Sequence, residues 1–276
     1  MTDVFLAAVA QMTSTDDRQA NRVAAEELIR RAASMGAQLV VLPEMWPYIG
    51  DNRSRLADAE DLDGPSTRLI RELSAELRVT IFGGTIAERS EDGRGVHNTA
   101  IAAGPDGALL ARYRKIHLFD VDIPGGAQFR ESDDVTAGDR AVVCDTALGR
   151  VGMTTCYDLR FPLLYERLRE AGCTMVTVPS AFTAHTGKDH WEVLLRARAI
   201  EQQVYVLAAD QGGWHNRGRQ SHGHSMIVDP WGLVVARASD GPGLALAPID
   251  PQRLAQVRVQ LPCGRHRRPF FGPAPA

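Results

Sequence analysis

The length, composition and charge of the chain exclude several classes of protein. Its 276 residues are 44% apolar and 24% charged, which is typical of a folded protein that buries roughly three quarters of its unfolded surface. Lys and Arg number 31 against 34 Asp and Glu, giving a net charge of -3. This balance lacks the basic surplus that binding to a phosphate backbone requires. We therefore expect one globular domain that does not bind nucleic acid.

The sequence indicates neither membrane crossing nor export. The longest apolar runs, 37–43 and 175–179, are much shorter than the roughly 20 residues that span a bilayer. The N-terminus lacks the basic flank and cleavage site of a secretory signal. The four cysteines form no C-x-x-C pair. Cys144 and Cys173 fit packing positions, and Cys263 lies in the tail. We expect free thiols in a reducing, cytoplasmic compartment.

The first half of the chain predicts a strand–helix–strand unit followed by a hairpin. Residues 4–10 and 39–42 are short apolar runs typical of buried strands, and residues 17–35 between them carry apolar side chains at helical spacing. Such a unit places its two strands parallel. A helix at 64–78 and three strands follow, and a Gly-Pro-Asp-Gly turn predicts that the last two strands pair as a hairpin. These three strands cover 79–82, 98–102 and 109–113.

The second half repeats this alternation, although its residues show no internal repeat. The predicted elements are a strand at 151–155, a helix from about 162, a strand at 175–179, a helix at 191–202, a strand at 204–208 and a hairpin of 225–228 with 233–236. Strands this apolar need cover on both faces, so we expect an α/β fold with two mixed sheets face to face and helices outside. Residues 123–140 and the tail from 261 match no element, and a loop of the first length is usually functional or disordered.

Three chemically reactive residues follow predicted strands. Cys156 lies where the strand at 151–155 passes into a helix, so backbone N–H groups of the turn can face a developing oxyanion; the alternative is a small buried hydrophobe. Glu44 ends the strand at 39–43, at the edge where parallel sheets bind ligands, and its alternative is a solvated carboxylate. Lys115 follows another strand, and its alternative is a surface lysine.

These residues and their neighbours together resemble a known family. The three segments are Leu42-Pro43-Glu44, Arg114-Lys115 with 117–120, and 152–158 with Arg160-Phe161-Pro162. In order and spacing they resemble the three signatures of the nitrilase superfamily of carbon–nitrogen hydrolases. The resemblance extends from residue 8 to about residue 269.

The resemblance implies a fold and an assembly. In that superfamily the fold is a four-layer α-β-β-α sandwich, and two chains pair as a dimer, so a homodimer or a higher homo-oligomer is expected. We therefore expect one hydrolase domain, 1–262, and a Pro/Arg-rich tail, 263–276, which is a candidate for the dimer interface.

The resemblance also implies a catalytic site. We expect it to need no cofactor and no metal, because no nearby carboxylate and third ligand complete a zinc pattern with His185 and His190. Glu44, Lys115 and Cys156 match the catalytic triad, in which the thiol attacks an amide carbonyl and Glu44 transfers the proton. Lys115 then supplies a cation that lowers the pKa of the Cys156 thiol, and it holds the oxyanion together with the N–H of Tyr157. Glu131 matches a second functional acid in the loop that follows the lysine signature.

Within the superfamily the chain most resembles the Nit branch, whose members hydrolyse deaminated glutathione or ω-amides. Residues 190–201 and 223–232 carry this resemblance. It implies a thiol-dependent amidase that hydrolyses a terminal amide of a small anionic metabolite, with deaminated glutathione as the first candidate. The alternative is an ω-amidase acting on α-keto amides such as 2-oxoglutaramate. A non-catalytic interaction protein on the same scaffold is the alternative from another class.

The residues that bind the substrate are less sharply indicated. An anionic substrate favours an arginine fork, and Arg160 is one candidate, although an ion pair at the start of its helix is the competing interpretation. Tyr48, Phe182 and Trp191 are candidates for the apolar wall of a pocket, with core packing as the alternative for each. The loops 212–222, with Arg217 and Arg219, and 123–131 are candidates for contacting a peptide-like tail.

Overall fold

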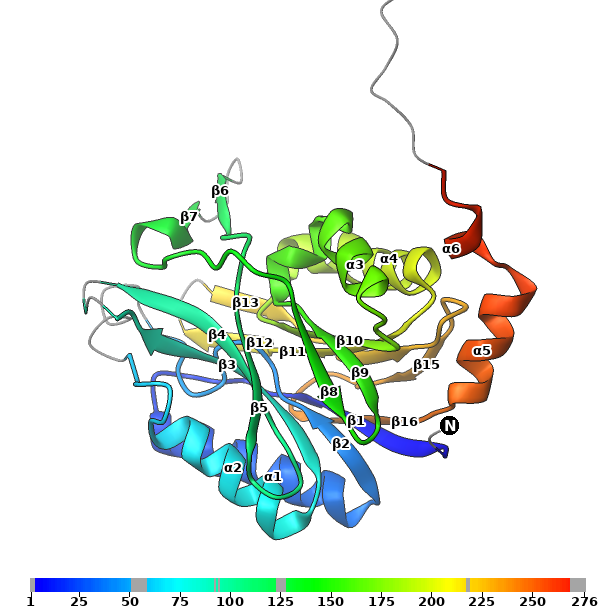
Figure 1. The fold of residues 1–276 in the computed structure, drawn as a ribbon. Coiled ribbons are helices and arrows are strands. Elements are labelled where there is room, and N and C mark those ends of the chain that lie inside the picture. Colours follow the sequence, from blue (N-terminus) through cyan, green and yellow to red (C-terminus); the bar gives the residue numbers. More distant parts are fainter. Residues whose placement is uncertain are drawn as a thin grey trace, which may run out of the picture.

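Two six-stranded mixed sheets form the centre of the molecule (Figure 1). The computed structural model describes residues 3–50, 59–91, 93, 95–122, 128–216 and 219–268. In spatial order, the first sheet contains β16 (Gly243–Ile249), β1 (Phe5–Gln11), β2 (Ala37–Val41), β3 (Thr80–Arg89), β4 (Val96–Ala103) and β5 (Leu109–Arg114). The second contains β15 (Val234–Arg237), β14 (Met226–Val228), β11 (Tyr205–Asp210), β10 (Met175–Ser180), β9 (Gly149–Met153) and β8 (Val142–Thr146).

Helices cover the outer face of each sheet. The first sheet is covered by α1 (Arg18–Ser34) and α2 (Pro65–Leu77), and the second by α3 (Pro162–Glu170) and α4 (Ala184–Gln202). Two further helices, α5 (Pro251–Gln260) and α6 (Cys263–His266), follow the last strand. Within the described ranges, the remaining elements are two small hairpins and two short 3-10 helices: β6 (Asp120–Asp122) with β7 (Gln128–Arg130), β12 (Gly212–Asn216) with β13 (Arg219–His222), η2 (Glu131–Asp133) and η3 (Cys156–Arg160).

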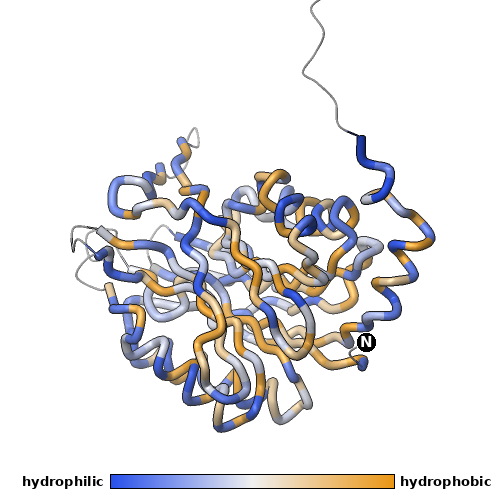
Figure 2. The backbone as a smooth tube through the Cα atoms, in the orientation of Figure 1, coloured by the Kyte–Doolittle hydropathy of each residue, from blue (hydrophilic) through white to orange (hydrophobic). Residues whose placement is uncertain are grey.

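The strands are apolar on both faces because both faces are buried. In β1, Ala7 and Val9 face the core between the two sheets, whereas Ala8 and Ala10 face the layer beneath α1 and α2. The same alternation recurs in β2 and β11, as expected for side chains that point to opposite faces of a strand. Figure 2 shows the resulting pattern, with apolar strands inside and mixed polarity on the covering helices. The order of layers is therefore α-β-β-α, which confirms the predicted fold.

Local sequence signals set the ends of several elements. Asp17 caps α1 by accepting a hydrogen bond from the backbone N–H of Ala20 at 2.9 Å, and Gly36, with a φ of +91°, turns the chain after the helix. The following strand pairs parallel to β1, as the strand–helix–strand unit predicts. The predicted hairpins of β4 with β5 and of β14 with β15 are also confirmed.

The predictions differ from the structure in several elements. The helix predicted at 191–202 begins at Ala184, because its first turns, AHTGKDH, have no apolar periodicity. The strand predicted at 79–82 continues to Arg89. The segment 212–222, predicted as a loop, includes the β12–β13 hairpin. Strands β8 and β16 and helix α5 were not among the predicted elements.

Gly187 lies in the first turns of α4, and the packing around it explains why a glycine occurs inside this helix. A Cβ added at this position would lie 2.3 Å from the Cβ of His222, so only glycine allows β13 to pack directly against the helix. This contact brings the β12–β13 hairpin to the end of the second sheet. Separately, within the described ranges no helix has both the length and the apolar character needed to cross a membrane.

Candidate active site

The three predicted catalytic residues meet at one end of the sandwich. Glu44 follows β2, Lys115 follows β5 and Cys156 follows β9, so the carboxyl ends of strands from both sheets deliver them. The Lys115 Nζ lies 3.0 Å from Glu44 Oε1 and 2.8 Å from Glu131 Oε2. All four side chains are buried, with exposed fractions between 2% and 8%. Lys115 is therefore not the surface lysine of the alternative interpretation.

A fifth residue, Asn98 on β4, completes this network. Its Nδ2 donates to Glu44 Oε1 at 2.8 Å and to Glu131 Oε1 at 3.1 Å. Its backbone carbonyl accepts from the N–H of Lys115 at 2.9 Å. This residue was not among the predicted site residues, because an asparagine inside a strand has no motif of its own. The available signal is that Asn98 belongs to a short polar group, 97–99, at the start of a strand whose later residues are apolar.

A backbone N–H group also donates to each of these two carboxylates. The N–H of Ala181, just after β10, donates to Glu44 Oε2 at 2.8 Å, and the N–H of Phe119 donates to Glu131 Oε2 at 2.7 Å. Each carboxylate thus accepts at least three hydrogen bonds from rigid groups, which limits its orientations. Such a preorganised environment favours proton transfer at a defined atom.

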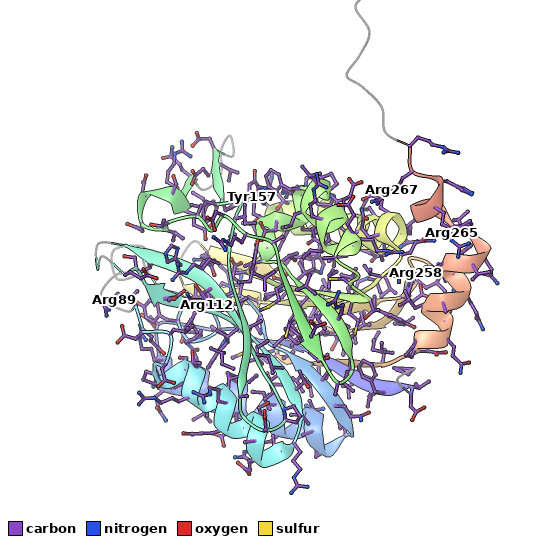
Figure 3. All side chains as sticks on the ribbon, viewed as in Figure 1. Arg89, Arg112, Tyr157, Arg258, Arg265 and Arg267 are labelled. Carbon is purple, nitrogen blue, oxygen red and sulfur yellow. The ribbon has the colours of Figure 1, made fainter. Side chains whose placement is uncertain are left out.

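Cys156 occupies a strained turn between β9 and η3. Its φ is +47°, a left-handed conformation that costs free energy for a residue with a Cβ and that recurs at functional sites. The turn lifts the thiol out of the strand and places it at the floor of a pocket. Tyr157 is the next residue of η3, so its backbone N–H belongs to the first turn, where helical donors have no partner within the helix. Figure 3 places Tyr157 on the side of the molecule from which β6 and β7 project.

Asp158 braces this turn against the segment that carries Lys115. The carboxylate accepts hydrogen bonds from the N–H of Thr155 at 2.9 Å, the hydroxyl of Tyr113 at 2.6 Å, and both the N–H and the Nδ1–H of His117 at 3.1 and 2.7 Å. Asp158 is fully buried. It therefore fixes the position of Cys156 relative to Lys115.

The resting site keeps its charge on the acids and the amine rather than on sulfur. Burial raises the pKa of the Cys156 thiol well above its usual range, and the charge of Glu44 raises it further, against the opposing effect of Lys115. Lys115 does act to lower this pKa, as expected, but desolvation and Glu44 outweigh it in the resting site.

Lys115 and Glu131 stabilise each other as an ion pair. Burial alone would lower the pKa of Lys115, but the charges of Glu131 and Glu44 outweigh burial and raise it. Burial would likewise raise the pKa of Glu131, and the charge of Lys115 reverses this effect and lowers it. Two carboxylates thus share one ammonium group, beside a thiol that is neutral at rest.

A pocket of about 650 Å³ lies above the thiol. Aromatic side chains form much of its wall, and arginines stand at its margin: Phe119, Phe129, Tyr157, Phe182, Arg130, Arg160 and Arg219. Arg130 is half-buried and pairs with Asp122 at 2.6 Å. The pocket therefore combines an apolar wall with positive charge, which suits a small organic anion.

Two of the four predicted substrate-binding residues line the pocket above Cys156, and the other two do not. Arg160 and Phe182 line the pocket, and the Arg160 guanidinium lies 5.2 Å from the ring centre of Phe182. Trp191 is fully buried behind Phe182, with ring centres 5.2 Å apart. Tyr48 lines a neighbouring cavity instead.

Arg160 does not form the ion pair that was the competing interpretation. Its hydrogen-bonding neighbour is His190, with Nη1 3.3 Å from Nδ1, and within the described segments no carboxylate oxygen lies in salt-bridge range of it. Of the loop residues singled out by sequence, Arg219 lines the pocket. Arg217 and the segment 123–127 lie outside the described residues.

The other cysteines differ from Cys156 in their surroundings. Cys144 and Cys173 are buried in the cores, which confirms their prediction as packing residues. Burial raises their pKa values to about 11 and about 12. All four cysteines are free. Across the part of the chain that the structure describes, no cluster of three or more His, Cys, Asp or Glu could hold a metal ion.

Comparison with known proteins assigns the family. Residues 6–259 match the carbon-nitrogen hydrolase family. The chain belongs to this family. Its relatives include a deaminated glutathione amidase of Synechocystis sp., which is 45% identical over 95% of this chain and 98% of the relative. A chloroplastic omega-amidase of Arabidopsis thaliana is 41% identical over 96% of this chain and 72% of the relative.

A solved structure supports the same assignment. Saccharomyces cerevisiae Nit3, a member of branch 10 of the nitrilase superfamily, aligns with a TM-score of 0.89 and 30% identity, covering 97% of this chain and 98% of the other. The amidases among its relatives show that this carbon–nitrogen hydrolase is an amidase. The family match confirms the resemblance found in the three sequence motifs.

Proposed function

We propose that this carbon–nitrogen hydrolase hydrolyses the terminal amide of a small anionic metabolite, with deaminated glutathione as its substrate. The convergence of Cys156, Glu44 and Lys115 in one buried site carries this proposal. The relatives named deaminated glutathione amidase, at 45% identity over nearly the whole chain, support the choice of substrate.

The mechanism begins with a thiol that must lose its proton as it attacks. The Cys156 thiol is in hydrogen-bonding reach of Glu44, so Glu44 accepts the proton while sulfur bonds to the amide carbon. Lys115 and the backbone N–H of Tyr157 stabilise the negative charge that forms on the carbonyl oxygen, an interaction of the kind worth roughly 3 kcal/mol per donor.

Collapse of this intermediate releases ammonia and leaves a thioester. Glu44 returns the proton to the departing nitrogen, and it then takes a proton from water as the water attacks the thioester carbon. Glu131 acts through its contact with Lys115, whose ammonium group it keeps charged and in place. The acid half of the substrate leaves last, and the thiol regains its proton.

Arg160 binds the substrate carboxylate in this proposal. Its guanidinium lines the pocket over the rings of Phe182 and Tyr157. The rings hold the plane of the group, and the N–H donors other than the one that faces His190 are available to the substrate. Arg160→Lys keeps the charge but loses the fork, so KM for the anionic amide should rise about tenfold with little change in kcat. A matched rise for an uncharged amide would argue against this role.

Two experiments test the proposed function. Intact-mass analysis of the protein quenched during turnover should show an acyl adduct on Cys156, and its mass identifies the acid half of the substrate. Parallel assays with deaminated glutathione and 2-oxoglutaramate should show a higher kcat/KM for deaminated glutathione. The reverse preference would favour the ω-amidase alternative, which the Arabidopsis relative supports.

We also propose that the protein is a cytoplasmic homodimer. Large apolar side chains are exposed on the outer helices, with Leu163 on α3 and Val193 on α4 exposed by 60% and 65%, and a partner chain would cover such groups. The first residues of the predicted tail contact the same layer, since Arg267 pairs with Glu166 of α3 at 2.9 Å. Light scattering of the purified protein should give twice the mass of the 276-residue chain.

A further inference from the structure

A second cavity adjoins the substrate pocket on the side of Glu131. We call it the rear cavity; it has a volume of about 530 Å³, and its lining includes Pro47, Ile86, Ala87, Val96, Asn98 and Glu131. Met45 and Glu131 line both this cavity and the pocket above Cys156. The two spaces are therefore separated by single side chains next to the catalytic network.

Asn98 presents an unused hydrogen-bond acceptor at this boundary. Its orientation is determined, because its Nδ2 faces two carboxylates, which accept hydrogen bonds and cannot donate them. The remaining end is Oδ1, which is buried and has no hydrogen-bond partner among the residues that the structure describes. Asn98 lines the rear cavity but not the substrate pocket. A buried acceptor beside a cavity calls for a small donor such as water or ammonia.

The proposed reaction requires the passage of two such molecules beside Glu44. The C–N bond breaks, and the nitrogen leaves as ammonia with the proton that Glu44 took from sulfur. Water then adds to the thioester carbon and gives one proton to Glu44, and the C–S bond breaks as that proton returns to sulfur. During the interval between these steps the acyl group occupies the pocket above Cys156, so the substrate entrance is obstructed.

We propose that the rear cavity binds ammonia and water at Asn98 and is the route by which ammonia leaves and the hydrolytic water enters. The carboxylates that line the rear cavity are paired with cations, Glu131 with Lys115 at 2.8 Å and Glu60 with Arg18 at 3.5 Å. The acceptor of Asn98 therefore selects the occupant, which is a small hydrogen-bond donor. This inference rests on the proposed amidase function, and it assigns separate paths to the acyl half and the ammonia.

Filling the rear cavity tests the route without altering the triad. Ala87→Phe places a ring in the cavity, and Ala87→Leu is a smaller filling in case the first variant folds poorly. Ala111→Phe is the matched control, since Ala111 is also a half-buried alanine in the same sheet and lines neither cavity. Thermal unfolding of each variant shows that it is folded before its kinetics are compared.

The proposal predicts a specific kinetic pattern. In Ala87→Phe, kcat should fall about fivefold, the single-turnover rate of acyl-enzyme formation should remain within twofold of wild type, and intact-mass analysis should show acyl-enzyme accumulating in the steady state. Ala111→Phe should show no accumulation.

Other results would overturn the proposal. An unchanged kcat in a folded Ala87→Phe protein would show that no molecule needs the rear cavity, and an equal loss of acylation rate would show that the ring disturbs the triad itself. Ala87→Leu then decides between the two explanations. A lower kcat with an unchanged rate of acyl-enzyme formation supports the proposal, and an equal loss of both rates overturns it. A wild-type protein that releases no ammonia from any amide would instead refute the proposed function and remove the premise of the route.

Discussion

At the scale of single residues, the reactivity of the site depends on the transfer of the Cys156 thiol proton to Glu44. Cys156 rests as a neutral thiol because burial and Glu44 both disfavour the thiolate. A neutral thiol attacks slowly unless a base takes its proton at the same moment. Glu44 is the base within reach, and its carboxylate is already oriented by Lys115, Asn98 and Ala181. Nucleophile and base therefore act as one unit.

Substitution of the cysteines should separate the nucleophile from the packing residues. Cys156→Ala should abolish ammonia release and Cys156→Ser should nearly abolish it, because a hydroxyl is a far weaker nucleophile here. Cys173→Ala should keep most of the activity, since Cys173 contributes to the core beneath α3. Amidase assays of the purified variants measure both effects. Equal losses at the two positions would contradict the assignment of the nucleophile.

Loss of the second acid should shift the alkaline limb of the pH profile. Glu131 raises the pKa of Lys115, so Glu131→Gln removes a stabilising charge and the ammonium group deprotonates at a lower pH. Activity should therefore fall at a lower alkaline pH than in wild type, and kcat at neutral pH should drop by about 100-fold. The pH dependence of kcat measures the shift. The shift would be in the wrong direction if the variant tolerated higher pH than wild type.

At the scale of elements, the site depends on the brace between η3 and the segment after β5. Asp158 joins Thr155, Tyr113 and His117, which come from two different sheets. The strained turn at Cys156 has no stabilising glycine, so contacts from outside the turn must hold it. These contacts hold the ends of β9 and β5 together and thereby fix the distance between the Cys156 sulfur and the Lys115 ammonium group.

Asp158→Asn should therefore weaken both folding and catalysis. An amide cannot accept from all four donors, so buried donors lose their partner and the free energy of unfolding should fall by roughly 3 kcal/mol. The value of kcat should fall as the turn relaxes. Urea denaturation and steady-state kinetics measure the two effects. Asp145→Asn is the control, because Asp145 is an exposed acid paired with Arg150, and it should change stability by less than about 1 kcal/mol.

At the scale of the whole molecule, two hairpins and two sheets must stay assembled around one site. His215 on β12 helps to join them, since its Nδ1 donates to the carbonyl of Ser14 and its Nε2 accepts from the hydroxyl of Ser221, each at 2.8 Å. Burial lowers the pKa of His215 to about 4. The neutral ring therefore links the segment after β1 to the β12–β13 hairpin that forms one wall of the pocket.

This buried histidine makes stability depend on pH in a defined direction. Its pKa in the folded state lies below the unfolded value of about 6.5, so protonation favours unfolding, and stability is complete above 6.5 and falls as pH drops towards 4. Between pH 6.5 and 5 the loss attributable to His215 should be about 2 kcal/mol. Urea denaturation of wild type and His215→Gln across this range measures it. His266→Gln, at an exposed position, should leave the slope unchanged.

The order of residues along the chain was sufficient for much of this description. Apolar runs and helical spacing predicted the strand–helix–strand unit and the hairpins, because burial on both faces leaves a strong local signal. The motifs around Glu44, Lys115 and Cys156 identified the family because they resemble, in order and spacing, the three signatures of the nitrilase superfamily. Glu131 also followed from its place after the lysine signature.

Tertiary structure alone decided how these residues are connected. Asn98, on a buried strand, hydrogen-bonds both Glu44 and Glu131, and Asp158 connects the two sheets. These hydrogen bonds join residues more than 30 positions apart, so they leave no local pattern in the sequence. The neutral state of Cys156 likewise depends on desolvation by the surrounding layers. The residues next to Cys156 in the sequence do not determine that desolvation. Local sequence encodes which elements form, whereas charge, burial and distance arise only when the elements pack.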